Sequence, residues 1–248
     1  MNAAAWRLPP ESLVLNSDEV HVWRVHLNAL PSAITNLLGT LAPDERARAE
    51  RFYFEKDRNH YIVARGMLRA ILGRYLRVAP AEIRFAYSHY GKPALAAERH
   101  AKPLCFNLSH SHEVALYGVT LGREIGIDVE HIRPDVANEQ VAERFFSSNE
   151  VARLRSLSPH MQTEAFFNCW TRKEAYIKAR GEGLSYPLDQ FDVSLAQGEP
   201  AALLATRPDA QEALRWSVKE LKCEPRYVAS LVVEGQARHF EYWRWSPQ

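Results

Sequence analysis

Three features are missing from this sequence: closely spaced cysteines, long apolar runs and an excess of charge of one sign. The cysteines, Cys105, Cys169 and Cys223, form no Cys-x-x-Cys pair and no zinc-binding spacing, so a cysteine-based zinc module is excluded. Such cysteine usage is typical of reduced thiols in the cytoplasm. No apolar run approaches the about 20 residues that a membrane helix needs, and the first residues lack the order of a signal peptide. We therefore expect a cytoplasmic protein with no membrane partner.

The charge balance is nearly neutral, with 31 Lys and Arg against 30 Asp and Glu and a formal net charge of +1. This balance gives no general attraction to nucleic acid, and no basic–aromatic array stands out, so we expect no nucleic-acid partner. Hydrophobic residues make up 46% and charged residues 25% of the chain, which is typical of a globular protein. The length of 248 residues fits one large domain or two small ones.

Hydrophobic periodicity and turn residues predict a mixed series of helices and strands. Helices are expected over residues 44–54 and 57–77, from Ser147, and over 161–180, with Asp57 and Ser147 as N-terminal caps and Gly181 as a C-terminal cap. Strands are expected over residues 21–27, 83–87, 104–108, 114–119, 124–130, 191–195, 215–221, 227–233 and 240–245. Because helices and strands do not alternate regularly, the predicted class is α+β.

The first chemical motif is Ile125-Gly126-Ile127-Asp128-Val129-Glu130. Side chains alternate along a strand, so Asp128 and Glu130 point to one face. Gly126 shares that face and would leave room beside the carboxylates. Two carboxylates next to open space suit a hard cation such as Mg²⁺. A solvated strand edge with two ordinary acids is the alternative.

The second motif is the helical segment Trp170 to Lys178, in which Trp170, Glu174 and Lys178 lie four residues apart on one face. Phe166 adds an apolar residue one turn earlier. A carboxylate beside an apolar stripe is often partly buried and functional. The alternative is a surface Glu–Lys pair with little effect on stability.

Two further groups of residues could bind an anion. Phe106-Asn107-Leu108-Ser109-His110-Ser111 ends a predicted strand and could donate to a phosphate or assist a nucleophile, whereas no Gly-x-Ser-x-Gly motif supports a hydrolase triad. A polar turn is the alternative. Cations are scattered through the N-terminal part of the chain and could be either an anion site or solvated residues: Arg48, Arg51, Arg65, Arg69 and Lys92.

The order of these motifs resembles that of the surfactin-synthetase-type 4′-phosphopantetheinyl transferases. The segments that carry the resemblance are Gly91-Lys92-Pro93, Phe106 to Ser111, Gly126 to Glu130, Phe145-Phe146-Ser147 with Glu150, Trp170 to Lys178, and Gly181-Glu182-Gly183-Leu184. The resemblance extends from about Arg46 to about Val193. It implies an α+β monomer of two similar halves, residues 1–122 and 123–248, related by a pseudo-two-fold axis with the site in the cleft between them.

The resemblance also implies a reaction. Such an enzyme transfers 4′-phosphopantetheine from coenzyme A to a serine of an apo acyl or peptidyl carrier protein, with Mg²⁺, and releases adenosine 3′,5′-bisphosphate. The carrier would belong to a fatty acid, polyketide or nonribosomal peptide synthase. Two alternatives remain: a Mg²⁺-dependent phosphohydrolase, and a non-catalytic module that binds coenzyme A or a carrier protein.

The resemblance assigns expected roles to individual residues. Asp128, Glu130 and Glu174 would hold Mg²⁺, Glu174 would also act as the base for the carrier serine, and Lys178 would stabilise charge on the phosphate that leaves. The phosphates of coenzyme A would be bound by Arg48, Arg65, Lys92, Ser109, His110 and Lys178. The N-terminal half would supply most coenzyme contacts, and the C-terminal half the metal ligands.

Two acidic residues, Glu45 and Glu150, have a less direct assignment. Glu45 stands where family members often place a basic residue. Glu150 stands where the family has an acid near the metal, but it also has capping-box spacing from Ser147, so either role is open.

Overall fold

The computed structural model describes residues 6–96, 103–137, 139–207 and 209–247. The helices are α1 (Pro31–Thr40), α2 (Pro43–Glu50), α3 (Glu55–Leu76), α4 (Glu139–Phe145), α5 (Ser148–Ser156) and α6 (Pro159–Arg180). The strands are β1 (Glu19–His26), β2 (Phe85–Tyr87), β3 (Pro93–Leu95), β4 (Leu104–Ser111), β5 (Val114–Leu121), β6 (Ile125–His131), β7 (Phe191–Val193), β8 (Leu203–Thr206), β9 (Trp216–Leu221), β10 (Tyr227–Glu234) and β11 (His239–Arg244). This mixture confirms the α+β class.

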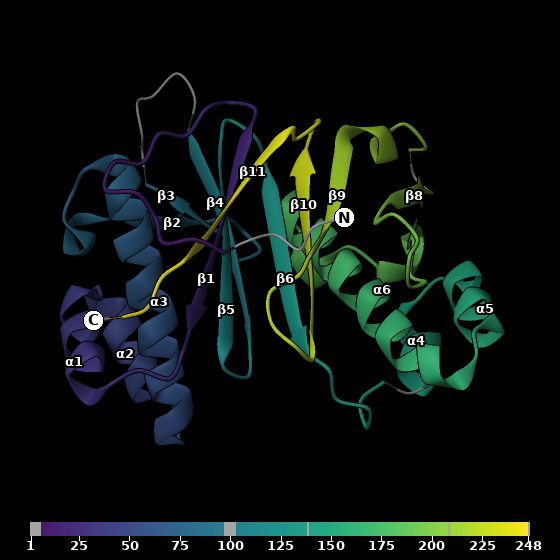
Figure 1. Cartoon of the computed structure of the whole chain (residues 1–248), viewed down its shortest axis with the longest axis horizontal. Helices are drawn as coiled ribbons and strands as arrows, with labels where there is room; N and C mark the ends of the chain where they lie inside the picture. Colours follow the sequence, from purple (N-terminus) through teal and green to yellow (C-terminus); the bar gives the residue numbers. More distant parts are fainter. Residues whose placement is uncertain (1–5, 97–102, 138, 208, 248) are drawn as a thin grey trace.

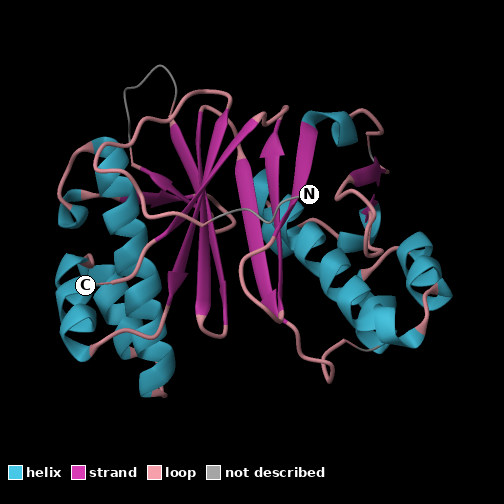
Figure 2. Cartoon of the chain, viewed as in Figure 1, coloured by secondary structure: helices cyan, strands magenta, loops and turns pink. Residues whose placement is uncertain are grey.

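Two sheets stand between two groups of helices (Figure 1, Figure 2). The larger sheet has the strand order β11-β1-β5-β4, and the smaller has the order β6-β10-β9. Helices α1 to α3 lie on the outer side of the larger sheet, and α4 to α6 lie on the outer side of the smaller one. Two short ladders, β2-β3 and β7-β8, complete the strands of the described residues.

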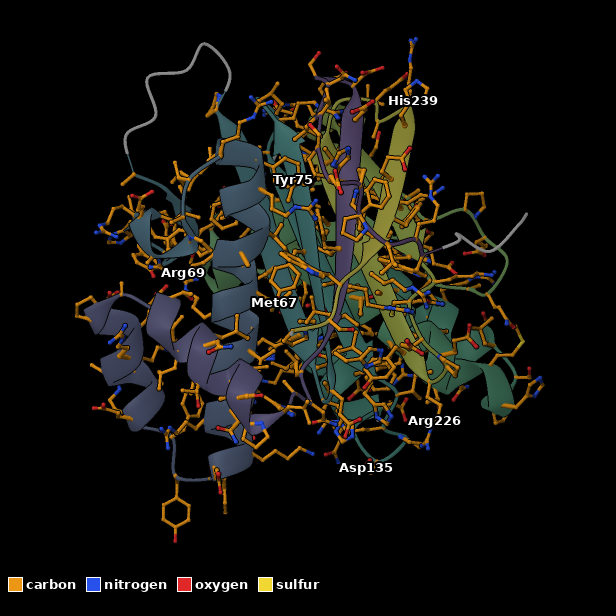
Figure 3. The ribbon with its side chains drawn as sticks, turned by 60° about the vertical axis from the view of Figure 1, so that its left-hand side comes forward. Met67, Arg69, Tyr75, Asp135, Arg226 and His239 are labelled. Atoms are coloured by element: carbon orange, nitrogen blue, oxygen red, sulfur yellow. The ribbon has the colours of Figure 1, made fainter. Side chains whose placement is uncertain are left out.

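Buried apolar side chains fill the spaces between these layers. Met67 and Leu68 of α3 pack with Trp23 and Val25 of β1, and Figure 3 shows Met67 and Tyr75 beside the strands. A second cluster surrounds α6, and a third lies between the two sheets, where valines and isoleucines of β1, β5, β6 and β10 meet. Burial of this apolar surface is the main favourable contribution to folding.

The last strand crosses from one half of the chain to the other. β11 pairs in parallel with β1, in the register Glu19↔His239 to Arg24↔Arg244. The division of the chain into two halves between residues 122 and 123 remains a proposal. In the structure, β11 comes from the second half of the chain but belongs to the sheet of the first half. In the described part of the chain, no helix has the length and apolar character needed to cross a membrane.

The structure differs from the sequence predictions in several local features. Phe54 is the N-cap of α3 and Asp57 lies in its first turn, so the prediction that Asp57 caps this helix is wrong. Ser147 and Gly181 do cap their helices as predicted, with Gly181 at a φ of 77°. Four elements of the structure were not predicted from the sequence, namely α1, α4, β3 and β8.

Gly126 brings β6 and α6 into direct backbone contact. A Cβ atom at Gly126 would lie 2.0 Å from the carbonyl oxygen of Ala175 and 2.3 Å from the amide nitrogen of Ala179. The expectation that Gly126 leaves room for a ligand is therefore wrong, because the backbone of α6 fills this space. The close approach instead places the side chains of α6 beside those of β6.

Gly126→Ala should destabilise the protein strongly. The added methyl group overlaps backbone atoms of α6, so the helix or strand must move, and we expect a loss of at least about 3 kcal/mol in the free energy of unfolding. Urea unfolding measures this loss.

Gly39→Ala in α1 is the matched control, because a Cβ atom at Gly39 meets nothing within 4 Å. This variant should stay within about 1 kcal/mol of the wild-type protein. Equal unfolding midpoints for the two variants would contradict the tight contact between β6 and α6.

Candidate active site

Two carboxylates of β6 and two residues of α6 form the centre of the site. Asp128 is 3% exposed, and Glu130 follows it on the same face of β6. Glu174 and Lys178 lie one turn apart on α6. Because Gly126 allows α6 to approach β6, the stripe predicted on the helix and the acidic face predicted on the strand come together.

The polar residues of β4 hold this acidic face. The Asn107 side chain accepts a hydrogen bond from the backbone amide of Ile127 at 3.0 Å. Ser109 Oγ donates to Asp128 at 2.8 Å, and Ser111 Oγ donates to Glu130 at 2.7 Å. This segment is a strand and not the polar turn that was the alternative.

The contacts of Asn107 and Ser111 with β6 were not predicted from the sequence, which indicated only that this segment could donate to a phosphate or assist a nucleophile. Their only signal was the alternation of polar residues at positions 107, 109 and 111, which puts these side chains on one face of a strand.

Lys178 is the cation at the centre of the site. Its ammonium group donates to Asp128 Oδ1 at 2.6 Å and to Ser109 Oγ at 3.1 Å, and it lies 3.4 Å from the carbonyl oxygen of Ile127. Asp128 Oδ2 is buried and has no hydrogen-bond partner among the described residues. Half of this buried carboxylate thus lacks the stabilisation that burial requires.

Burial and neighbouring negative charge raise the pKa of two carboxylates of the site. Burial, together with the negative charges of Asp128 and Glu130, raises the pKa of Glu174 to about 7, against the lowering effect of Lys178. Burial also raises the pKa of Glu130, against the lowering effect of its hydrogen bond from Ser111. Like charges close together in a buried place favour either protonation or the binding of a cation.

The donor set fits a divalent cation of the Mg²⁺ type. It consists of carboxylate and hydroxyl oxygens, which such ions prefer, and it includes the unpartnered Asp128 Oδ2. As the side chains stand, no group of three or more His, Cys, Asp or Glu in the described ranges is gathered tightly enough to hold a metal. Lys178 occupies the other oxygen of Asp128 in this arrangement.

The predicted phosphate-binding residues occupy different places. Ser109 lies beside Asp128 and Lys178, whereas His110 is the next residue of β4, so its side chain points to the opposite face of the strand, where it is exposed. Lys92 donates to Glu124 at 2.6 Å and to the carbonyl oxygen of Ala179 at 2.9 Å. It therefore sits at the C-terminal end of α6, where a cation is favoured.

Arg48 and Arg65 lie farther out, on α2 and α3. The guanidinium of Arg48 stacks over Tyr61 at 5.6 Å from the ring centroid. Arg65 is buried, pairs with Glu45 and donates to the hydroxyl of Tyr87. Both arginines contact residues of α2, α3 or β2, and neither forms an ion pair with Asp128, Glu130 or Glu174 in the described part of the chain.

The contacts of Glu45 account for an acidic residue at a position where the family often has a basic one. It is 2% exposed and lies between Arg65 and Arg69, with a distance of 2.7 Å to Arg69. Arg69 also donates to the carbonyl oxygens of Pro80 and Ile83, so the cluster joins α2 and α3 to the segment that leads into β2. Nothing local in the sequence signals this pairing, because Arg65 follows Glu45 by 20 residues.

Glu150 uses its carboxylate to hold the local structure. It forms the capping box with Ser147, pairs with Lys173 at 2.7 Å and accepts from the amide of Val193 at 2.8 Å. Both oxygens of Glu150 thus have partners away from Asp128. The sequence left two roles open for Glu150, and these contacts match the capping role.

Comparison with known proteins agrees with this geometry. A family model described as "4'-phosphopantetheinyl transferase superfamily" matches residues 124–232, and one described as "4'-phosphopantetheinyl transferase, N-terminal" matches residues 26–119. The chain is 42% identical to the 4′-phosphopantetheinyl transferase HetI of Nostoc sp. over 240 residues, which cover 97% of this chain and 98% of that protein.

Two further relatives show the same pattern. A putative 4′-phosphopantetheinyl transferase of Synechocystis sp., slr0495, is 32% identical over 82% of this chain and 77% of its own length. The 4′-phosphopantetheinyl transferase Sfp of Bacillus subtilis is 34% identical over 63% of this chain and 67% of its own length. The chain therefore belongs to the 4′-phosphopantetheinyl transferase family and is an enzyme of that class.

Proposed function

We propose that this enzyme transfers 4′-phosphopantetheine from coenzyme A to a serine hydroxyl of an apo acyl or peptidyl carrier protein, and that it uses Mg²⁺ to do so. The other product is adenosine 3′,5′-bisphosphate. The observation that carries the proposal is the meeting of Asp128, Glu130, Glu174 and Lys178 where β6 packs against α6. Three carboxylates and one ammonium group at this contact would supply metal ligands, a base and a phosphate ligand.

The carboxylates of Asp128, Glu130 and Glu174 would hold the metal ion. When bound, Mg²⁺ would neutralise negative charge on the pyrophosphate of coenzyme A and orient the phosphoryl group for attack. Ser109 and Ser111 fix two of these carboxylates through hydrogen bonds from β4, so the ligands are oriented before the ion binds.

Glu174 is the proposed base. The serine hydroxyl of the carrier is a poor nucleophile until its proton is removed. A carboxylate with a pKa of about 7 is well matched to accept that proton near neutral pH, either directly or through one water.

The cations of the site are proposed to bind the phosphates of coenzyme A. Lys178 would stabilise the charge that develops as the bisphosphate leaves. Ser109 accepts a hydrogen bond from Lys178, and Lys92 donates to the carbonyl oxygen of Ala179, the next residue of α6, so both could contact the same ligand. His110 and Arg48 would bind the outer phosphates. Arg65 would contribute mainly charge, because its cluster with Glu45 and Arg69 combines one carboxylate with two guanidinium groups.

The partner class follows from the family. We propose a carrier domain of a fatty acid, polyketide or nonribosomal peptide synthase as the substrate. We also propose that the enzyme acts as a monomer in the cytoplasm, and the three unpaired cysteines support a reducing compartment. A phosphohydrolase or a non-catalytic binding module is not favoured, because the chain aligns over most of its length with relatives named as 4′-phosphopantetheinyl transferases, such as HetI.

Incubation of an apo carrier protein with the enzyme, coenzyme A and Mg²⁺ should add one phosphopantetheine group, as measured by intact mass. EDTA should prevent the gain, and Asp128→Asn should reduce the rate at least about 100-fold. An unmodified carrier together with free phosphopantetheine would indicate a hydrolase instead. No product, with coenzyme A still bound, would indicate a binding module.

Glu174→Gln should lose at least about 100-fold in transfer rate while it stabilises the metal-free fold. Because the pKa of Glu174 is raised in the folded state, ionisation of this group costs stability as the pH rises from about 5 to 7. The variant should therefore melt clearly above the wild-type protein at pH 8, with a much smaller difference near pH 5.

Glu164→Gln is the matched control for the melting experiment. Glu164 lies ten residues earlier on α6, about 15 Å along the helix from Glu174. This control should shift the melting temperature equally at the two pH values. A pH-independent effect of Glu174→Gln would contradict the raised pKa, and wild-type turnover would exclude Glu174 as the base.

A further inference from the structure

We propose that the ammonium group of Lys178 takes the position of a metal ion beside Asp128 in the free enzyme, and that it moves to a phosphate of coenzyme A when the metal binds. This inference rests on the proposed function, because it takes Asp128 to be a metal ligand. In the free state the ammonium group would neutralise Asp128. In the loaded state the same group would contact a phosphate, and Asp128 would bind the divalent cation.

The contacts of Lys178 are those expected of a substitute cation. Its nitrogen is coordinated by three oxygens, from Asp128, Ser109 and the backbone of Ile127. Among the described residues, this is the only ion pair that Asp128 makes. A carboxylate as buried as this one is unstable without a positive partner, so an ammonium group stabilises it in the absence of metal.

The two oxygens of Asp128 differ in a way that leads to competition. Oδ1 accepts hydrogen bonds from both Lys178 and Ser109, whereas Oδ2 is buried without a partner. A divalent cation that binds the carboxylate would lie close to the ammonium group on Oδ1. The two cations repel each other at such a distance, so metal binding should favour the release of Lys178.

Lys178 is less enclosed than the carboxylate that it contacts. Its side chain is 28% exposed, against 4% for that of Asp128, and it has a flexible four-carbon stem. Two other cations at this end of α6 already have partners: Lys92 pairs with Glu124 and donates to the carbonyl oxygen of Ala179, and Arg180 pairs with Glu182 and Glu212. Lys178 is therefore the cation positioned to transfer from the carboxylate to an arriving phosphate.

A thermodynamic consequence separates this proposal from a purely structural ion pair. If the phosphates of coenzyme A draw Lys178 away from Asp128, coenzyme and metal should each strengthen the binding of the other. Removal of the ammonium group should strengthen metal binding in the absence of coenzyme and should abolish most of this coupling. A lysine that only stabilises the fold would leave the coupling between coenzyme and metal unchanged when it is removed.

The test is Mn²⁺ binding to the full chain, measured by electron paramagnetic resonance with and without coenzyme A. Without coenzyme, Lys178→Met should lower the Mn²⁺ dissociation constant roughly 10-fold or more relative to wild type, from the energy of a charge-assisted hydrogen bond. Lys178→Arg keeps the charge and should bind Mn²⁺ as weakly as wild type. Coenzyme A should strengthen Mn²⁺ binding in the wild-type enzyme much more than in Lys178→Met.

Two controls distinguish failure of this proposal from failure of the metal site. Lys92→Met removes a positive charge at the same end of α6 and should leave Mn²⁺ affinity without coenzyme near the wild-type value. Equal Mn²⁺ affinity in wild type and Lys178→Met, with binding lost in Asp128→Asn, would overturn the proposed movement of Lys178 and leave the metal site standing. Unchanged binding in Asp128→Asn would overturn both.

Discussion

The contact between the backbones of β6 and α6 at Gly126 is the constraint on which the site depends. No side chain fits between the strand and the helix at this point. Asp128 follows two residues later on the same face of β6, and Glu174 and Lys178 lie on the turns of α6 that pass it. A strand and a helix held at this distance bring the carboxylates of Asp128 and Glu174 and the ammonium group of Lys178 to one place. Packing of the two backbones thus fixes the arrangement of these side chains.

Repulsion among the carboxylates of the site lowers the stability of the fold and suits the binding of a ligand. Asp128, Glu130 and Glu174 repel one another, and Glu174 is held at a pKa of about 7 by burial and by that repulsion. Hydrogen bonds from Ser109 and Ser111 and the ammonium group of Lys178 offset part of the cost. Sites with unrelieved charge are common where a ligand supplies the missing partner. In the proposed function, the missing partner is a divalent cation bound together with the phosphates of coenzyme A.

The local content of the site could be predicted from the sequence. A period of two placed Asp128 and Glu130 on one face, and a period of four placed Glu174 and Lys178 on another. The caps at Ser147 and Gly181 were also readable, because capping depends on residues within one turn. These features need only the geometry of a single element.

The non-local features could not be predicted in this way. The acidic face of β6 and the Glu174–Lys178 face of α6 lie close together because of Gly126. The sequence suggested that this glycine leaves space for a ligand, but the backbone of α6 fills that space. The buried cluster of Glu45 with Arg65 and Arg69 joins segments 20 or more residues apart, and so gave the appearance of free cations. The parallel pairing of β11 with β1 connects the two ends of the chain, which no local pattern reports.

Anomalous diffraction from crystals of the full chain grown with Mn²⁺ and coenzyme A would test the central claim most directly. The account predicts one manganese peak at direct ligand distance from the Asp128 carboxylate, facing Glu130 and Glu174, with the Lys178 nitrogen moved from Asp128 to a phosphate. A peak elsewhere, or no peak beside Asp128 while the coenzyme is bound, would contradict it.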